Sequence, residues 1–180
     1  MIPVELNEQV QTTVLHYFAG ERQEMLLIVG GSLLFSALSL WLWWATRTNF
    51  AATFALTVIA TAILFSATAL SLSVRDRGLS ASLVYALDTP QQGTMLAVER
   101  ERIAVVVSKY PYYRHASGVI TLIALLGLAL SSRDWVHGLA AGLLLLVVAQ
   151  VLIDHYSERR ATHHLNRLDA YAAELASSAS

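Results

Sequence analysis

The fold is decided by residues 74–115, which read VRDRGLSASLVYALDTPQQGTMLAVERERIAVVVSKYPYYRH. This stretch is the one long polar interval between two hydrophobic blocks of sequence. It holds six of the twelve Lys and Arg residues: Arg75, Arg77, Arg100, Arg102, Lys109 and Arg114. We interpret it as a polar connection between two hydrophobic hairpins.

The composition of the whole chain is that of a membrane protein. Of 180 residues, 56% are hydrophobic and only 14% are charged, whereas a soluble domain averages about 25% charged residues. The net charge of −1 gives no basic face for nucleic acid. The chain has no cysteine, which excludes disulfides, thiolate catalysis and cysteine metal sites. The first 24 residues are acidic, unlike a secretory signal, so we expect the first hydrophobic block to stay in the membrane.

The hydrophobic blocks predict an all-α fold with four membrane-spanning helices arranged as two hairpins. The predicted spans are residues 25–45, 51–73, 116–132 and 135–153. At about 1.5 Å per residue, the first of them reaches roughly the 30 Å of a hydrocarbon core. Two tight turns, residues 46–49 and 131–134, join the helices of each hairpin, and we predict Asn49 and Asp134 as N-caps.

The remaining segments predict helices outside the membrane, within a single domain over residues 1–180. Residues 1–24 repeat apolar side chains every four positions, at Leu6, Val10, Val14 and Phe18. We expect this helix to pack on other cytosolic helices. Residues 154–176 continue as a helix with a seam at Leu165, Leu168, Ala172 and Leu175, followed by a disordered tail at 177–180.

Glycine and proline predict interruptions of these helices. Gly20 suggests a kink or a break before the first span, and Gly78 a break before a short helix over residues 79–87. Thr89, Pro90 and Gln92 resemble the capped start of the next helix, which we expect to stop at Pro111.

The positive-inside rule orients the chain. Four spans place both termini and residues 74–115 on one side, which carries ten of the twelve Lys and Arg residues. Arg47 and Arg133 alone fall on the other side. The rule therefore places both termini in the cytosol, as expected for a protein of the bacterial inner membrane.

The spans contain no Asp, Glu, Lys or Arg. Proton-coupled transporters, pumps and intramembrane hydrolases usually need such a residue at depth, so we predict no catalytic residue, cofactor or metal site. A cytosolic group of His155, His163 and His164 could ligate a metal, but its spacing favours a solvated helix surface. The charge run from Glu99 to Arg102 could be a docking surface for a cytosolic protein. We favour a solvent-exposed helix face on which the charges pair with neighbours.

Seven residues of the hairpins are candidates for contact with a partner. They are the threonine stripe of the second span, the tryptophans beside the turns and one histidine: Thr53, Thr57, Thr61, Trp43, Trp44, Trp135 and His137. Small and hydroxyl residues allow close helix approach, and ordinary packing within the chain explains the stripe equally well. Tryptophan prefers the membrane–water boundary, which the three Trp residues would mark.

The four-span layout and small size resemble the bacterial inner-membrane immunity proteins that protect a cell against pore-forming toxins, including toxins of type VI secretion. The resemblance implies a non-enzymatic protein whose spans bind a membrane-inserting toxin within the lipid bilayer. One alternative is a subunit of a small channel or transporter, which would need a homo-oligomer. Another is a membrane enzyme with its site among the cytosolic histidines.

Overall fold

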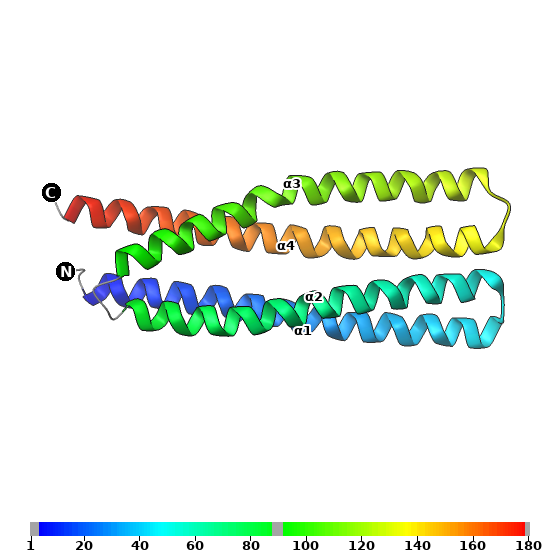
Figure 1. The fold of residues 1–180 in the computed structure, drawn as a ribbon, viewed down its shortest axis with the longest axis horizontal. Coiled ribbons are helices and arrows are strands. Elements are labelled where there is room, and N and C mark those ends of the chain that lie inside the picture. The colour runs from blue at the N-terminus through cyan, green and yellow to red at the C-terminus, as the bar shows by residue number, and fades with distance from the viewer. Residues whose placement is uncertain (1–3, 88–91, 179–180) are drawn as a thin grey trace. The chain divides into compact units, whose positions relative to one another are not determined.

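The computed structural model describes the backbone of residues 4–87 and 92–178 and the side chains of residues 9–85 and 93–174. Four long helices make up this part of the chain: α1 (Val4–Thr46), α2 (Asn49–Leu87), α3 (Gln92–Leu130) and α4 (Asp134–Ser178) (Figure 1). All four are long and apolar enough to cross a membrane. The all-α prediction is confirmed, and the chain has the character of a membrane protein.

The turn between α1 and α2 is closed by local hydrogen bonds. Arg47 has a φ of 54°, and its amide donates to the Trp43 carbonyl oxygen at 2.8 Å, a left-handed ending common at helix C-termini. The hydroxyl of Thr48 accepts a hydrogen bond from the Ala51 amide at 3.2 Å. Thr48 is therefore the N-cap, and the prediction of Asn49 is wrong by one residue because Asn49 already belongs to the helix.

The turn between α3 and α4 is also closed by local hydrogen bonds. The amides of Val136 and His137 both donate to the Arg133 carbonyl oxygen, at 3.0 and 3.2 Å. Arg133 therefore occupies the cap position, and Asp134 is the first helical residue rather than the predicted N-cap. The carboxylate of Asp134 still stabilises α4, because a negative charge in the first turn interacts favourably with the helix dipole.

The predicted breaks within the helices are wrong, whereas the alternative of a kink at Gly20 stays a prediction. α1 continues through Gly20, α2 through Gly78 and α3 through Pro111. A glycine costs a helix only about 1 kcal/mol relative to alanine, which packing of a long helix readily outweighs. The predicted cap at Thr89 and Pro90 lies outside the described residues. α4 runs to Ser178, past the predicted start of a disordered tail, and residues 179–180 lie outside the described residues.

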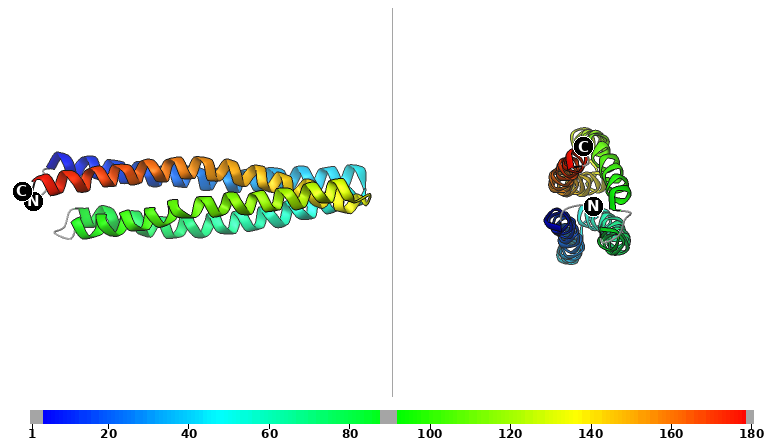
Figure 2. Two further views of the ribbon diagram at one scale, coloured as in Figure 1. Left: turned by 90° about the horizontal axis from the view of Figure 1, so that it is seen from above. Right: turned by 90° about the vertical axis from the view of Figure 1, so that its left-hand side faces the viewer.

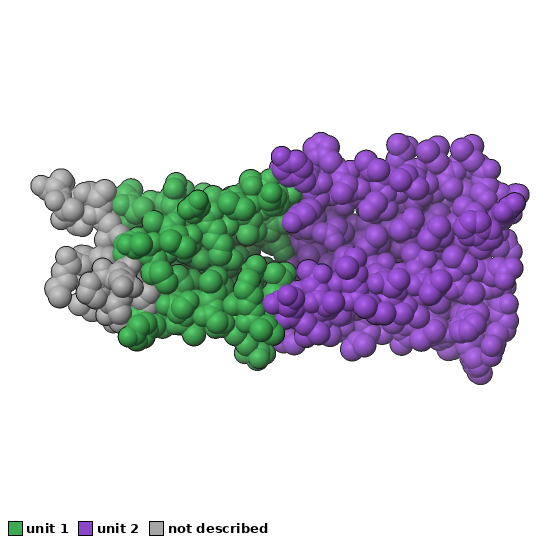
Figure 3. Space-filling model, in the orientation of Figure 1, with its two compact units in different colours: residues 1–23, 72–110, 155–180 green, residues 24–71, 111–154 purple. Residues whose placement is uncertain are grey.

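The chain groups into two compact units (Figure 3). Unit 1 comprises residues 1–23, 72–110 and 155–180, and unit 2 comprises residues 24–71 and 111–154. Unit 1 gathers the three segments that the sequence analysis assigned to the cytosol, and unit 2 gathers the predicted spans. The two units are described separately below.

Unit 2 packs its helices through small side chains. Ala51, Ala55, Ala69, Ala124 and Ala140 are buried, whereas large apolar residues on all four helices are exposed. A Cβ atom added to Gly138 would lie 2.3 Å from the Phe50 carbonyl oxygen, and one added to Gly142 would lie 2.7 Å from the Thr57 Cβ. The backbones of α2 and α4 therefore approach closely at these two glycines. A lipid bilayer favours small residues at the helix contacts and large apolar residues on the surface.

Candidate functional site

Unit 1 is built around an apolar core to which all four helices contribute. The views in Figure 2 show the four helices gathered about one another in this part of the chain. The buried core residues are Val10, Val14, Tyr17, Phe18, Leu83, Leu96, Ile103, Tyr110, Ala161, Leu168 and Tyr171. The expectation that the N-terminal helix packs on other helices is confirmed for Val10, Val14 and Phe18, whereas the side chain of Leu6 lies outside the described residues.

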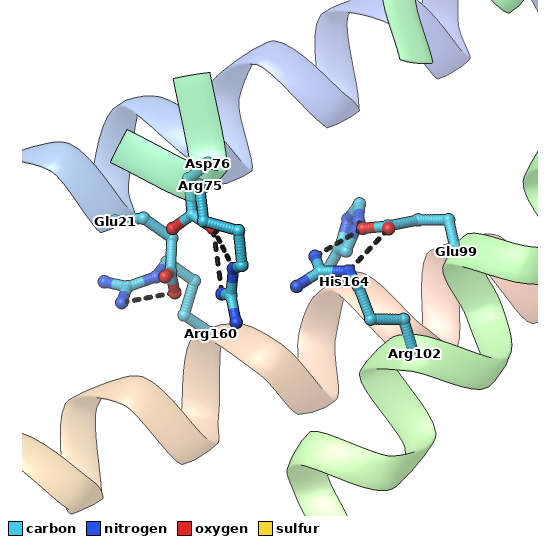
Figure 4. Close-up of polar contacts among 7 residues, drawn as sticks. All are labelled: Glu21, Arg75, Asp76, Glu99, Arg102, Arg160 and His164. Atoms are coloured by element: carbon cyan, nitrogen blue, oxygen red, sulfur yellow. Dashed lines mark hydrogen bonds and ion pairs between the residues drawn. The ribbon is translucent and has the colours of Figure 1, made fainter. Parts of the chain in front are cut away.

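Charged side chains are set within this core. Glu99 of α3 is only 2% exposed, and its two carboxylate oxygens accept hydrogen bonds from the Arg102 guanidinium, both at 2.7 Å (Figure 4). The guanidinium also lies over the Phe18 ring, 5.9 Å from its centre. A bidentate, charge-assisted pair of this kind holds both side chains in one geometry.

His164 of α4 completes the cluster around Glu99. It is 2% exposed, and its ring stacks on Tyr17 with 4.2 Å between the ring centres. Its Nε2 lies 3.5 Å from a Glu99 carboxylate oxygen, and neither ring nitrogen has a hydrogen-bond partner among the described residues. His164 is thus held by ring stacking and by the neighbouring carboxylate.

Two further ion pairs with a buried or partly buried carboxylate lie in the same unit, and a third, between Arg100 and Asp169, is exposed. Arg160 of α4 donates to Glu21 of α1 at 3.0 Å, and Arg75 donates to its neighbour Asp76 on α2 at 2.8 Å (Figure 4). Together with the Glu99–Arg102 pair, they give three carboxylates and three guanidinium groups. We call these six residues and His164 the ionic cluster. The charges of these three carboxylates and three guanidinium groups balance.

The pKa values in the ionic cluster reflect this pairing. Burial raises the pKa of Glu99, but the two hydrogen bonds from Arg102 and the proximity of the His164 ring outweigh burial, and the net pKa is lowered. Burial likewise opposes the charged form of Arg102, but its bonds to Glu99 raise the pKa overall. Burial, followed by the charge of Glu21, raises the pKa of Tyr17 well above its ordinary value. Glu99 is therefore a charged, paired carboxylate rather than a proton donor near neutral pH.

Two members of the ionic cluster are buried where the sequence predicts exposure. Glu99 and His164 were predicted on solvated helix surfaces, and both predictions are wrong, although Arg100, Glu101, His155 and His163 are exposed as expected. A signal was present in the spacing. Along α4 the buried positions repeat every three or four residues, at Ala161, His164, Leu168 and Tyr171.

The predicted C-terminal seam is shifted from this buried stripe. Leu168 is buried and Leu165 packs partly buried against the core, but Ala172 is exposed, and the side chain of Leu175 lies outside the described residues. Tyr171, which the prediction omitted, is buried and hydrogen-bonds the Thr13 hydroxyl at 3.0 Å. The predicted seam counts only aliphatic residues as core positions, so it misses the aromatic Tyr171.

Among the described residues, no group of three His, Asp or Glu side chains is placed to hold a metal ion. In the ionic cluster, the guanidinium groups occupy the carboxylates that would otherwise be ligands. Its geometry is suited to fixing the helices of unit 1 against one another.

The threonine stripe of α2 is largely satisfied within the chain. The hydroxyls of Thr53, Thr57 and Thr61 donate to the carbonyl oxygens four residues earlier, at 2.8–2.9 Å. Thr57 also packs against Gly142 of α4. The stripe therefore packs in the α2–α4 contact, and its hydroxyls already donate hydrogen bonds within α2.

The aromatic candidates are more accessible. Trp44 is 66% exposed, and Trp43 and Trp135 are also exposed beside the two turns. His137 is half-buried, and its Nε2 lies 2.7 Å from the Ser131 carbonyl oxygen, so it closes the α3–α4 turn. Of the seven candidates, the three tryptophans offer the most free surface.

Comparison with known proteins finds no matching family model, no matching curated protein and no matching solved structure.

Proposed function

We propose that this chain is a non-enzymatic protein of the bacterial inner membrane that acts by binding another membrane protein. The observation that carries the proposal is the surface of unit 2, where large apolar side chains such as Leu33, Leu64 and Leu122 are exposed. The four predicted spans contain no Asp, Glu, Lys or Arg. A lipid-facing segment without ionisable groups offers a surface for helix packing rather than a site for chemistry.

The hydrogen bonds of the spans support this view. The hydroxyls of the threonine stripe are satisfied within α2. Association in the bilayer would then depend on van der Waals packing of apolar side chains and on the aromatic residues at the turns. Trp44 and Trp135 are the strongest anchor candidates, because large rigid rings supply contact area at a low cost in conformational entropy.

We propose a pore-forming toxin as the partner, such as one delivered by type VI secretion. With the termini in the cytosol, only the short turns at residues 47–48 and 131–133 would face outside. Most of the surface that this chain could present to an incoming protein would then lie within the bilayer. An immunity protein of this build would bind the toxin's inserted helices and keep them from forming a conducting pore.

Co-expression tests the proposal. A pore-forming protein encoded beside this gene would be directed to the periplasm, and membrane potential would be followed with a voltage-sensitive dye. We expect cells with this chain to keep their potential and cells without it to depolarise. The double variant Trp44→Ala, Trp135→Ala should lose most of the protection. The matched control Thr57→Val should keep it, because the lost hydroxyl bonds only within α2.

Two outcomes would contradict the proposal. Equal depolarisation with and without the chain would remove the immunity function. Depolarisation by the chain alone, in the absence of the toxin, would favour the oligomeric channel instead.

A further inference from the structure

Three arginines of unit 1 hold exposed guanidinium groups that have no partner in the described part of the chain. They are Arg22 of α1, Arg77 of α2 and Arg159 of α4, and none of their guanidinium groups bonds or pairs with another described residue. We call these three residues the arginine belt. We propose that the arginine belt binds the headgroups of anionic phospholipids at the cytosolic surface of the membrane.

The other described cations of unit 1 are satisfied within the chain. Each of them has an interaction with another residue: Arg75, Arg100, Arg102, Lys109, Arg160 and Arg167. This holds also far from the predicted spans, where Arg100 pairs with Asp169 and Arg167 donates to the His163 ring at 3.3 Å. Among the described residues of unit 1, the unpartnered positive charge is therefore confined to the arginine belt.

The arginine belt lies at the end of unit 1 where the helices continue into the predicted spans. Each member is within six residues of a span end, about 9 Å along a helix at 1.5 Å per residue. Arg22 and Arg159 adjoin the two partners of the hydrogen bond from Arg160 to Glu21, which is 3.0 Å long (Figure 4). These two members therefore lie at one level of the unit.

The carboxylates nearest in sequence to the arginine belt are already engaged. Glu21 and Asp76 pair with arginines of the ionic cluster. Glu24, Asp154 and Glu158 also interact within the chain. The guanidinium groups of the arginine belt are thus available to an anion from outside the chain.

The chemistry of the arginine belt fits a phospholipid headgroup. A guanidinium group carries its charge throughout the physiological pH range, and its parallel N–H donors match the oxygens of a phosphate. A long arginine side chain can extend its charged end to the headgroups beside an apolar segment. Because its members belong to three helices, a membrane surface can meet all of them at once. The charge complementarity selects lipids with a net negative headgroup.

Lipid titration tests the arginine belt. The purified chain in a neutral detergent would be titrated with phosphatidylglycerol or with phosphatidylcholine of the same acyl chains, and bound lipid would be counted by native mass spectrometry. We expect tighter binding of phosphatidylglycerol. The double variant Arg22→Gln, Arg159→Gln should lower this preference by about fivefold for each guanidinium group removed.

A double variant with the same change of charge provides the control. Arg100→Gln, Arg167→Gln removes two exposed cations of unit 1 that lie away from the predicted spans, and it should leave the lipid preference unchanged. Helix content by circular dichroism would show that both double variants are folded.

Three results would overturn the inference. One is equal affinity for the two lipids, and another is an equal loss of preference in the control variant. The third is displacement of phosphatidylglycerol by inorganic phosphate, which would assign the arginine belt to a soluble anion. The inference rests on the membrane placement within the proposed function and not on the toxin. Lost lipid preference with intact protection against the toxin would refute only the lipid contact, and the reverse result would refute only the toxin partner.

Discussion

Removing the Glu99 carboxylate should open unit 1. In Glu99→Ala, the Arg102 guanidinium loses two bonds of 2.7 Å while its side chain stays only 22% exposed. Breaking a buried ion pair by deleting one partner costs about 3–5 kcal/mol. Arg102 also lies in the field of Asp76, which compensates part of the loss, so we expect a cost near the lower limit, about 3 kcal/mol.

The absence of cysteine makes this loss measurable. Ala161 is 1% exposed in the core of unit 1, so a single Ala161→Cys thiol should react with maleimide only when the unit opens. A change of about 3 kcal/mol should raise the labelling rate about 100-fold in the Glu99→Ala background, at roughly 1.4 kcal/mol per decade. Ala124→Cys, buried in unit 2, serves as the matched control and should label at an unchanged rate.

A second variant separates the ion pair from packing. Replacing both partners, as in Glu99→Leu with Arg102→Leu, leaves no unpaired charge and should cost much less than Glu99→Ala, because apolar replacement of a buried pair is often neutral. The reasoning is refuted if Glu99→Ala labels at the parent rate. It is equally refuted if the double variant labels as fast as Glu99→Ala.

Three further changes test other parts of the structure. The lowered pKa of Glu99 stabilises the fold above the ordinary glutamate pKa of about 4.3. That contribution is lost as pH falls through the lowered value, so hydrogen exchange of α3, corrected for intrinsic rates, should quicken there, but not in Glu99→Gln. Gly138→Ala should cost about 1–3 kcal/mol in detergent unfolding, because its Cβ would meet a backbone oxygen of α2, whereas Gly118→Ala should be neutral or stabilising. Thr48→Ala should cost about 1 kcal/mol in the same assay and Asn49→Ala less, since Thr48 is the cap.

The course of the chain could be predicted from the sequence because it follows from local chemistry. Apolar runs long enough to cross a bilayer, bounded by short polar turns, correspond to the ends of α1 to α4. The continuity of the helices could not be predicted. The local penalties, about 1 kcal/mol at Gly20 and Gly78 and about 3 kcal/mol at Pro111, are outweighed by the packing that long helices gain, and that packing depends on residues distant in sequence.

The ionic cluster shows a second limit of local reasoning. The spacing of Glu99 and Arg102 suggests a pair on a helix surface, and the pair does form. Its burial depends on Tyr17 and His164, which come from helices far away in the chain. A charged residue looks solvated in sequence until the side chains that cover it are known. The stripe through Ala161, His164 and Leu168 was the one local indication.

Topology mapping with single cysteines tests the central claim most directly, because the proposed partner contact depends on it. Ser132→Cys lies in the α3–α4 turn, and Glu101→Cys lies on the exposed face of α3 in unit 1. In intact bacterial cells, a membrane-impermeant maleimide should label Ser132→Cys at once and Glu101→Cys only after the inner membrane is permeabilised. Labelling of Glu101→Cys in intact cells, with Ser132→Cys protected, would contradict the orientation proposed for this protein.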